Sequence, residues 1–262
     1  MENQTKFNWK VFLTLWLASV IGIVAVLPYA LTLQASVIQQ ITATIPLGVI
    51  IAAQLIQSIL LFGAATSIGL VLAKRIGLGA PILEKFFAGE KVADHVRPFL
   101  LPVILFGLIG GLVILGLDKF VFMPALQTEL LQGSGTSGSQ TTPWQGFLAS
   151  FYGGIDEEIL LRLFLMSLLA WLGKFISRTA EGKPTTGVLW TANILAAVLF
   201  GLGHLPATAA IMTITPLVVV RAIVLNGLLG VGFGYFYTKY GLESAMLSHF
   251  SADIILHVVF SI

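Results

Sequence analysis

The sequence has no cysteine and few charged residues. Without cysteine the chain cannot form a disulfide, use a thiolate nucleophile or bind a metal through sulfur. Only 10% of its residues are charged, whereas about 25% are charged in a soluble domain. Hydrophobic residues make up 57% of the chain and the mean hydropathy is +0.96. We therefore expect an integral membrane protein whose partner is the lipid bilayer, with no nucleic-acid partner.

Apolar segments long enough to cross a bilayer recur along the whole chain. A spanning helix needs roughly 20 apolar residues, and seven segments approach that length: 9–33, 46–73, 98–117, 144–173, 187–206, 216–240 and 242–262. The segment between Pro206 and Pro216 is either a re-entrant turn or an eighth, partial span. The predicted fold class is an all-α, polytopic transmembrane helical bundle with about seven to eight spans.

Basic residues predict how this bundle is oriented. Eleven of the fourteen Lys and Arg residues fall at one end of the predicted spans: Lys6, Lys10, Lys74, Arg75, Lys85, Lys91, Arg97, Lys174, Arg178, Lys183 and Lys239. Lys119 alone falls at the other end. Because cytoplasmic loops are enriched in Lys and Arg, we expect a cytoplasmic N-terminus and an external C-terminus.

Two loops divide the chain into three parts. The segment 76–97 is amphipathic and is expected to lie on the cytoplasmic membrane surface. The stretch 132–142 is rich in Gly, Ser and Thr, which is typical of a flexible linker. We therefore predict N-terminal spans over 1–126, an outer linker over 127–143 and a second bundle over 144–262. No internal repeat supports a transporter built from inverted repeats.

The fourth predicted span carries four charged residues, Asp156, Glu157, Glu158 and Arg162. Each ionised group at the centre of a membrane helix costs roughly 2.5–3.5 kcal/mol, so these residues should face the protein interior or water. Glu158 and Arg162 are four apart and can pair on one helix face. Glu157 points about 100° away from Glu158 around the helix. It is therefore left available for chemistry, while Asp156 fits no pattern.

Two later spans also carry polar residues. Phe200 and His204 end the fifth span, and His249 and Asp253 share a face of the last one. Together with Glu157 they suggest a common interior site. The glycines between Gly227 and Gly234 are interpreted as tight helix packing and His257 as structural. Arg221 either snorkels or pairs with an acid such as Asp253.

These residues form three motifs in a fixed order. They are Glu-Glu-x-x-x-Arg (Glu157, Glu158, Arg162), Phe-x-x-x-His (Phe200, His204) and His-x-x-x-Asp (His249, Asp253). Over about residues 144–257 the chain resembles the CPBP family of membrane proteases. That family includes type II CAAX prenyl endopeptidases and the bacterial Abi or bacteriocin-immunity proteins.

The resemblance implies an intramembrane glutamate-type endopeptidase that acts on a membrane protein or a lipid-proximal peptide. Glu157 and His204 would activate a water molecule, and His249 with Asp253 would stabilise the oxyanion. Glu158, Arg162 and Phe200 would support the site. No cofactor is favoured.

Asp253 departs from the prenyl-protease branch, which has Asn there. An ionised Asp cannot donate a hydrogen bond to an oxyanion, so Asp253 would be protonated, would orient His249 or would bind a metal. A metal-dependent version of the protease would use Glu157, His204, His249 and Asp253 as zinc ligands.

Two other classes of function stay open. A non-catalytic immunity or binding protein would use the same bundle without hydrolysis, and a proton- or cation-coupled transporter would use the buried groups as a relay. The depth of His249 raises a further question. It lies only about 12 Å along its helix from Gly241, against about 25 Å for Glu157 and His204 from their cytoplasmic helix ends. Either the Tyr240–Gly241 turn is sunk into the protein, or the fourth and fifth spans extend into the cytoplasm.

Overall fold

The computed structural model describes residues 7–130 and 141–260, and over these ranges the chain is helical, with no β-strand. The first half contains α1 (Trp9–Leu33), α2 (Ala35–Thr42), α3 (Leu47–Ile76), α4 (Pro81–Phe87), α5 (Ala93–Leu117), η1 (Asp118–Phe122) and α6 (Met123–Leu130). The second half contains α7 (Pro143–Phe151), η2 (Tyr152–Glu157), η3 (Ile159–Met166), α8 (Ser167–Gly173), α9 (Thr186–Gly203), α10 (Leu205–Ala209), α11 (Pro216–Tyr240), α12 (Leu242–Asp253) and η4 (Ile254–Val259). The label η marks π-helical stretches. The predicted all-α fold is confirmed.

Local sequence explains where several of these helices begin and end. Pro143 and Pro216 occupy the first position of α7 and α11, where a missing N–H removes no helical hydrogen bond. The Thr142 N–H donates to Gln145 Oε1 at 2.9 Å, which caps α7. Gly77 ends α3 with a φ of 79°, a left-handed conformation that glycine adopts without strain.

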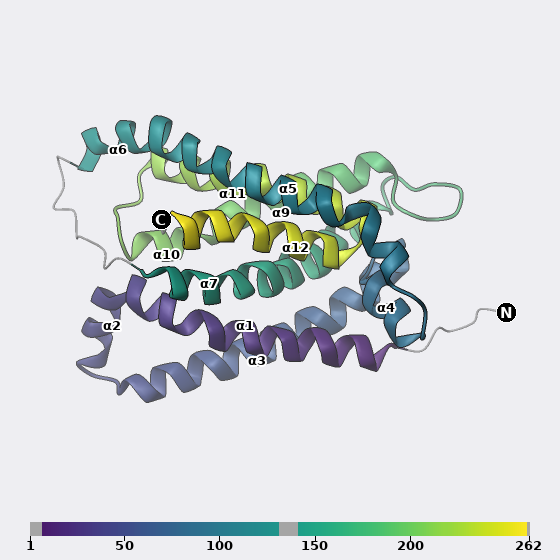
Figure 1. Cartoon of the computed structure of the whole chain (residues 1–262), viewed down its shortest axis with the longest axis horizontal. Helices are drawn as coiled ribbons and strands as arrows, with labels where there is room; N and C mark the ends of the chain where they lie inside the picture. The colour runs from purple at the N-terminus through teal and green to yellow at the C-terminus, as the bar shows by residue number, and fades with distance from the viewer. Residues whose placement is uncertain (1–6, 131–140, 261–262) are drawn as a thin grey trace.

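The long helices lie side by side along one axis (Figure 1). α1 packs against α3, α9 against α11, and α5 against α12. The continuous helical path from α7 through η2 and η3 to α8 packs against α1, α3, α9 and α12. It therefore connects the N-terminal spans with the C-terminal ones, and it carries the charged residues of the fourth predicted span into the middle of the bundle.

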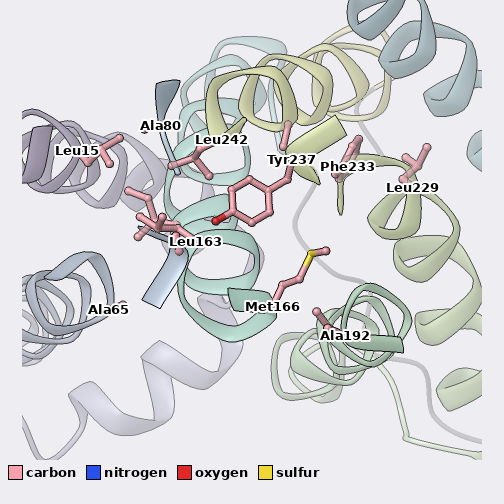
Figure 2. Packing of buried hydrophobic residues seen from close by; sticks show 14 of the residues in the cluster. Leu15, Ala65, Ala80, Leu163, Met166, Ala192, Leu229, Phe233, Tyr237 and Leu242 are labelled. Atoms are coloured by element: carbon pink, nitrogen blue, oxygen red, sulfur yellow. The ribbon is translucent and has the colours of Figure 1, made fainter. Parts of the chain in front are cut away.

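The apolar core surrounds this central path. Figure 2 shows Tyr237 of α11 among Leu163, Met166 and Leu242, all of which are fully buried. The Tyr237 hydroxyl forms a hydrogen bond of 2.8 Å with the Ser167 hydroxyl. A buried polar group without such a partner would be costly, so this pair joins α11 to the central path without an energetic penalty.

Within the described ranges, five helices are long and apolar enough to cross a membrane: Trp9–Leu33, Leu47–Ile76, Ala93–Gln127, Thr186–Ala209 and Pro216–Tyr240. On α3, Ile56 and Leu60 are 60% and 69% exposed, as expected of side chains that face lipid. The other two predicted spans correspond to the path from α7 to α8 and to α12 with η4. The protein is an integral membrane protein, and the predicted seven to eight spans are an approximate count.

The structure decides between the alternatives left open at two places. The apolar segment between Pro206 and Pro216 is no eighth span, because it forms the short helix α10 followed by a turn. Arg221 pairs with Asp118 rather than with Asp253. Its Nε and Nη2 each donate to one oxygen of the Asp118 carboxylate at 2.6 Å. This bidentate ion pair joins η1 to α11.

The turn at Tyr240–Gly241 is covered by the loop before α4. Gly241 and Leu242 are buried, and the Leu242 N–H donates to the Gly79 carbonyl at 3.0 Å. The Leu83 N–H of α4 donates to Glu243 Oε1 at 2.9 Å. This turn is therefore sunk into the protein, which accounts for the short helical distance from Gly241 to His249. The predicted linker falls largely on residues outside the described ranges.

Candidate active site

The two adjacent glutamates of the second half lie where the helix is widened. Glu157 ends η2 and Ile159 begins η3, so Glu158 lies between two π-helical stretches. π-Helical turns inside longer helices are frequent at functional sites. The widened turns direct the three consecutive acids Asp156, Glu157 and Glu158 toward different neighbours.

Glu158 pairs with Arg162 at the centre of the bundle. Arg162 Nε lies 3.3 Å from Glu158 Oε2, and both side chains are essentially inaccessible to solvent. Arg162 Nη2 also donates to the Gly230 carbonyl at 2.8 Å. The absence of a side chain at Gly230 leaves room for the guanidinium, which would approach a Cβ there to 3.1 Å. This pair neutralises both charges and fixes the central path against α11.

His249 lies at the centre of a polar cluster, in which it contacts the carboxylates of Glu157, Glu158 and Asp253. Its Nδ1 lies 2.8 Å from Glu158 Oε1, and its ring stacks on Phe233 with centroids 4.5 Å apart. Its Nε2 lies 3.6 Å from Glu157 Oε2 and 3.6 Å from Asp253 Oδ1. One imidazole nitrogen is therefore held by the buried ion pair, while the other faces the two remaining carboxyl groups.

Gly153 allows α12 to approach the central path at this point. A Cβ on Gly153 would overlap Asp253 Oδ2 and lie 3.3 Å from His249 Nε2. Only glycine leaves space for the Asp253 carboxylate against the η2 backbone. The motif patterns did not single out this residue, because its importance depends on a helix one hundred residues further along the chain.

His204 approaches the cluster through Phe200. It follows the last residue of α9, and its Nδ1 lies 2.9 Å from the Phe200 carbonyl oxygen. The Phe200 ring contacts both the His204 ring, at a centroid distance of 4.8 Å, and the His249 ring, at 5.5 Å. His204 is half-buried. It therefore lies beside the cluster formed by Glu157, Glu158, His249 and Asp253, with Phe200 between the two imidazoles.

Asp156 and His257 lie near the polar cluster but have other neighbours. Asp156 is fully buried and faces α1, where a Cβ on Gly22 would overlap its Oδ2. His257 lies one turn beyond Asp253, with its Nε2 4.0 Å from Asp253 Oδ1. Its Nδ1 lies 3.4 Å from the hydroxyl of Tyr29 on α1. Sequence patterns gave no reason to connect Tyr29 with this region.

The residues named for the zinc alternative do not form a ligand set in the part of the chain that the structure describes. There, no group of three or more His, Asp and Glu side chains is arranged to hold a metal ion. Glu157 and Asp253 converge on His249, but the Nδ1 of His204 is directed to the Phe200 carbonyl. We therefore assign no step to a metal ion.

The fold and the cluster define a class of protein, a helical membrane bundle with carboxylates and imidazoles gathered in its interior. Residues 139–255 match the family model described as Type II CAAX prenyl endopeptidase Rce1-like. This match confirms the resemblance to the CPBP family over that segment. Neither the curated proteins nor the solved structures contain a match to the chain.

Proposed function

We propose that the protein is an intramembrane endopeptidase that hydrolyses a peptide bond of a membrane-associated protein or peptide. The observation that carries this proposal is the convergence of Glu157 and Asp253 on Nε2 of His249 at 3.6 Å each. It occurs within the segment that matches a family of endopeptidases. Glu158 and Arg162 are already paired with each other, so Glu157 is the carboxylate left for catalysis.

In the proposed reaction Glu157 is the general base. Its side chain is 22% exposed, against 0% for Glu158, so it is the more accessible of the two carboxylates. Glu157 accepts a proton from water as the water oxygen attacks the peptide carbonyl carbon. The same proton then passes to the leaving amine as the carbon–nitrogen bond breaks. Proton transfer of this kind contributes about 10²–10⁴-fold to the rate.

The imidazoles complete the proposed machinery. Glu158 accepts a hydrogen bond from the Nδ1–H of His249 in the proposed arrangement, so Nε2 carries a proton when the ring is the imidazolium, and that Nε2–H donates to the oxyanion that forms on the attacked carbonyl. His204 lies beside Phe200 and assists in binding the water. Asp253 Oδ1 lies 3.6 Å from Nε2, so its carboxylate would stabilise the positive charge of the protonated His249 ring rather than donate to the oxyanion.

The family description suggests the class of substrate. The description names CAAX prenyl endopeptidases, so a prenylated peptide that carries a CAAX sequence is the first substrate class to test. Other peptides or proteins inserted in the bilayer are the second class, since the site lies inside a membrane bundle.

The experiment compares protein N-termini in membranes from cells that make the wild-type chain or its Glu157→Ala variant at equal abundance. We expect new N-termini that are present only with the wild-type chain. Glu181→Ala is the matched control, because Glu181 is exposed in the loop between α8 and α9 and should leave every product in place. Identical N-termini in all three samples, with folded protein in each, would overturn proteolysis and favour the non-catalytic binding role.

A second arm tests the metal-dependent alternative. The purified protein is treated with a zinc chelator, and cleavage of the identified substrate is measured before and after zinc is added back. Cleavage that survives chelation supports water activation by Glu157 alone. Cleavage that is lost and then restored by zinc would contradict it and favour the zinc enzyme.

A further inference from the structure

Asp253 is flanked by two histidines of its own helix. His249 lies one turn before it and His257 one turn after it, with their Nε2 atoms 3.6 Å and 4.0 Å from the same oxygen, Oδ1. The other oxygen, Oδ2, lies against Gly153. The Asp253 side chain is 9% exposed. A carboxylate buried this deeply requires partners, and the two imidazoles supply them.

His257 is itself held in place by the first helix of the chain. The Tyr29 hydroxyl lies 3.4 Å from His257 Nδ1, and the two rings meet edge to face with centroids 5.5 Å apart. If the Tyr29 O–H donates to Nδ1, the proton of a neutral His257 ring is on Nε2 and faces Asp253.

The backbone of η4 is fixed at the same place. A Cβ on Gly146 of α7 would overlap the His257 carbonyl oxygen, so α7 and η4 pack with no space between them. The backbone of His257 is therefore held against α7, which places its side chain beside Asp253. Tyr29 and His257 both lie outside residues 139–255, so the match to the endopeptidase family assigns them no role.

We propose that His257, oriented by Tyr29, is a positioning residue that holds the Asp253 carboxylate toward His249. This inference rests on the proposed endopeptidase function. It explains how the chain uses an acid where the prenyl-protease branch has Asn. An amide can donate a hydrogen bond itself, whereas a buried carboxylate needs a polar partner to fix its orientation, and His257 places its Nε2 4.0 Å from Asp253 Oδ1. Tyr29 makes α1 a part of the site.

The first test does not depend on activity. The chain has only four histidines, so nitrogen-15 labelling of histidine gives a small set of imidazole signals that single substitutions can assign. We expect Asp253→Asn to shift the side-chain nitrogen signals of both His249 and His257, and Tyr29→Phe to shift those of His257. His95, at the far end of the bundle, should be unchanged in both variants. Unchanged His257 signals in folded Asp253→Asn and Tyr29→Phe proteins would overturn the proposal.

The second test uses the substrate identified by the N-terminal comparison. We expect His257→Ala to lower kcat about tenfold with little change in KM, because misplacing a catalytic group slows the chemical step rather than binding. His257→Gln keeps a side-chain N–H and should recover most of the rate, and His95→Ala is the control. A wild-type kcat in His257→Ala would overturn the positioning role. If no chain cleaves any peptide, the proposed function fails, and the nitrogen signals still decide whether His257 holds Asp253.

Discussion

Adjacent glutamates have different surroundings in this protein. Glu158 is fully buried and is held by Arg162 and His249, whereas Glu157 is partly exposed and lies 3.6 Å from His249. A buried ion pair that loses one partner leaves an unpaired charge, which costs about 3–5 kcal/mol. Substituting Glu158 should therefore affect folding, and substituting Glu157 should affect chemistry.

This difference gives the first prediction. Glu157→Gln should lower product formation at least about 100-fold and leave the free energy of unfolding nearly unchanged. Glu158→Gln should lower the free energy of unfolding by about 3–5 kcal/mol. Denaturant titration of both proteins in micelles, with an assay of product, measures the two effects. Equal losses of stability in the two variants would show that their roles are not separated.

Gly153 gives the second prediction. An added methyl group there would displace the Asp253 carboxylate and crowd His249, so Gly153→Ala should lower product formation about 10–100-fold. Gly116→Ala in α5 is the control, because nothing lies within 4 Å of the added carbon. Both proteins are compared with wild type in the same product assay. Normal activity in Gly153→Ala would mean that Asp253 does not need its observed position.

At the scale of single residues, the sequence predicts contacts within one helix better than contacts between different helices. The four-residue spacing was enough to pair Glu158 with Arg162 and to align His249 with Asp253, because one helical turn sets both contacts. The same reasoning missed Gly153 and Tyr29, which matter through helices far away in sequence. It also offered Asp253 as a partner for Arg221, since nothing local indicates that η1 lies beside α11.

Contacts between helices depend on few polar links. One such link is the ion pair between Asp118 of η1 and Arg221 of α11, whose charged atoms lie 2.6 Å apart. It joins the helical segment after α5 to the second half of the chain. Arg221 lies twelve positions before Phe233, the α11 residue that stacks on His249, so the effect of its loss on stability is separable from any effect on the polar cluster.

The third prediction concerns this pair. Asp118→Asn and Arg221→Gln should each lower the free energy of unfolding, and the double variant should lose less than the sum of the two. We expect a coupling free energy of about 1–3 kcal/mol, measured by denaturant titration of all four proteins in micelles. Strict additivity would show that the ion pair contributes nothing to holding η1 on α11.

The π-helical stretches set the geometry of the site at the scale of elements. Regular 3.6-residue periodicity predicted Arg162 as a partner of Glu158, but it predicted neither the contact of Glu158 with His249 nor the π-helical stretches η2, η3 and η4. Such widening depends on tertiary packing rather than on local propensity. For the same reason the apolar pattern predicted the helices well and their ends less well, as the short α10 shows.

The whole molecule has two distinct ends. Figure 1 places α2 at one end of the bundle and α4 at the other, and Lys74 and Arg75 lie in the last turn of α3, which leads to α4. The excess of Lys and Arg at the α4 end predicts that this end faces the cytoplasm. Because the chain has no cysteine, a thiol reagent labels only a cysteine that is introduced. The labelling therefore shows on which side of the membrane that position lies.

The fourth prediction uses that property. A cysteine at Thr44, between α2 and α3, should react with a membrane-impermeant maleimide in intact cells. A cysteine at Lys91, in the loop before α5, should react only after the cells are opened. Both positions are exposed, so accessibility depends on the side of the membrane alone. The reverse labelling pattern would invert the predicted orientation.

Hydrolysis by Glu157 is the central claim, and one measurement tests it most directly. Purified wild-type and Glu157→Gln proteins are reconstituted in liposomes with a peptide that spans the identified cut site, in water enriched in oxygen-18. The account predicts two fragments from the wild-type chain, with one oxygen-18 atom in the new carboxyl group, and almost no fragments from Glu157→Gln. Equal fragment formation by the two proteins, or an intact peptide with both, would contradict it.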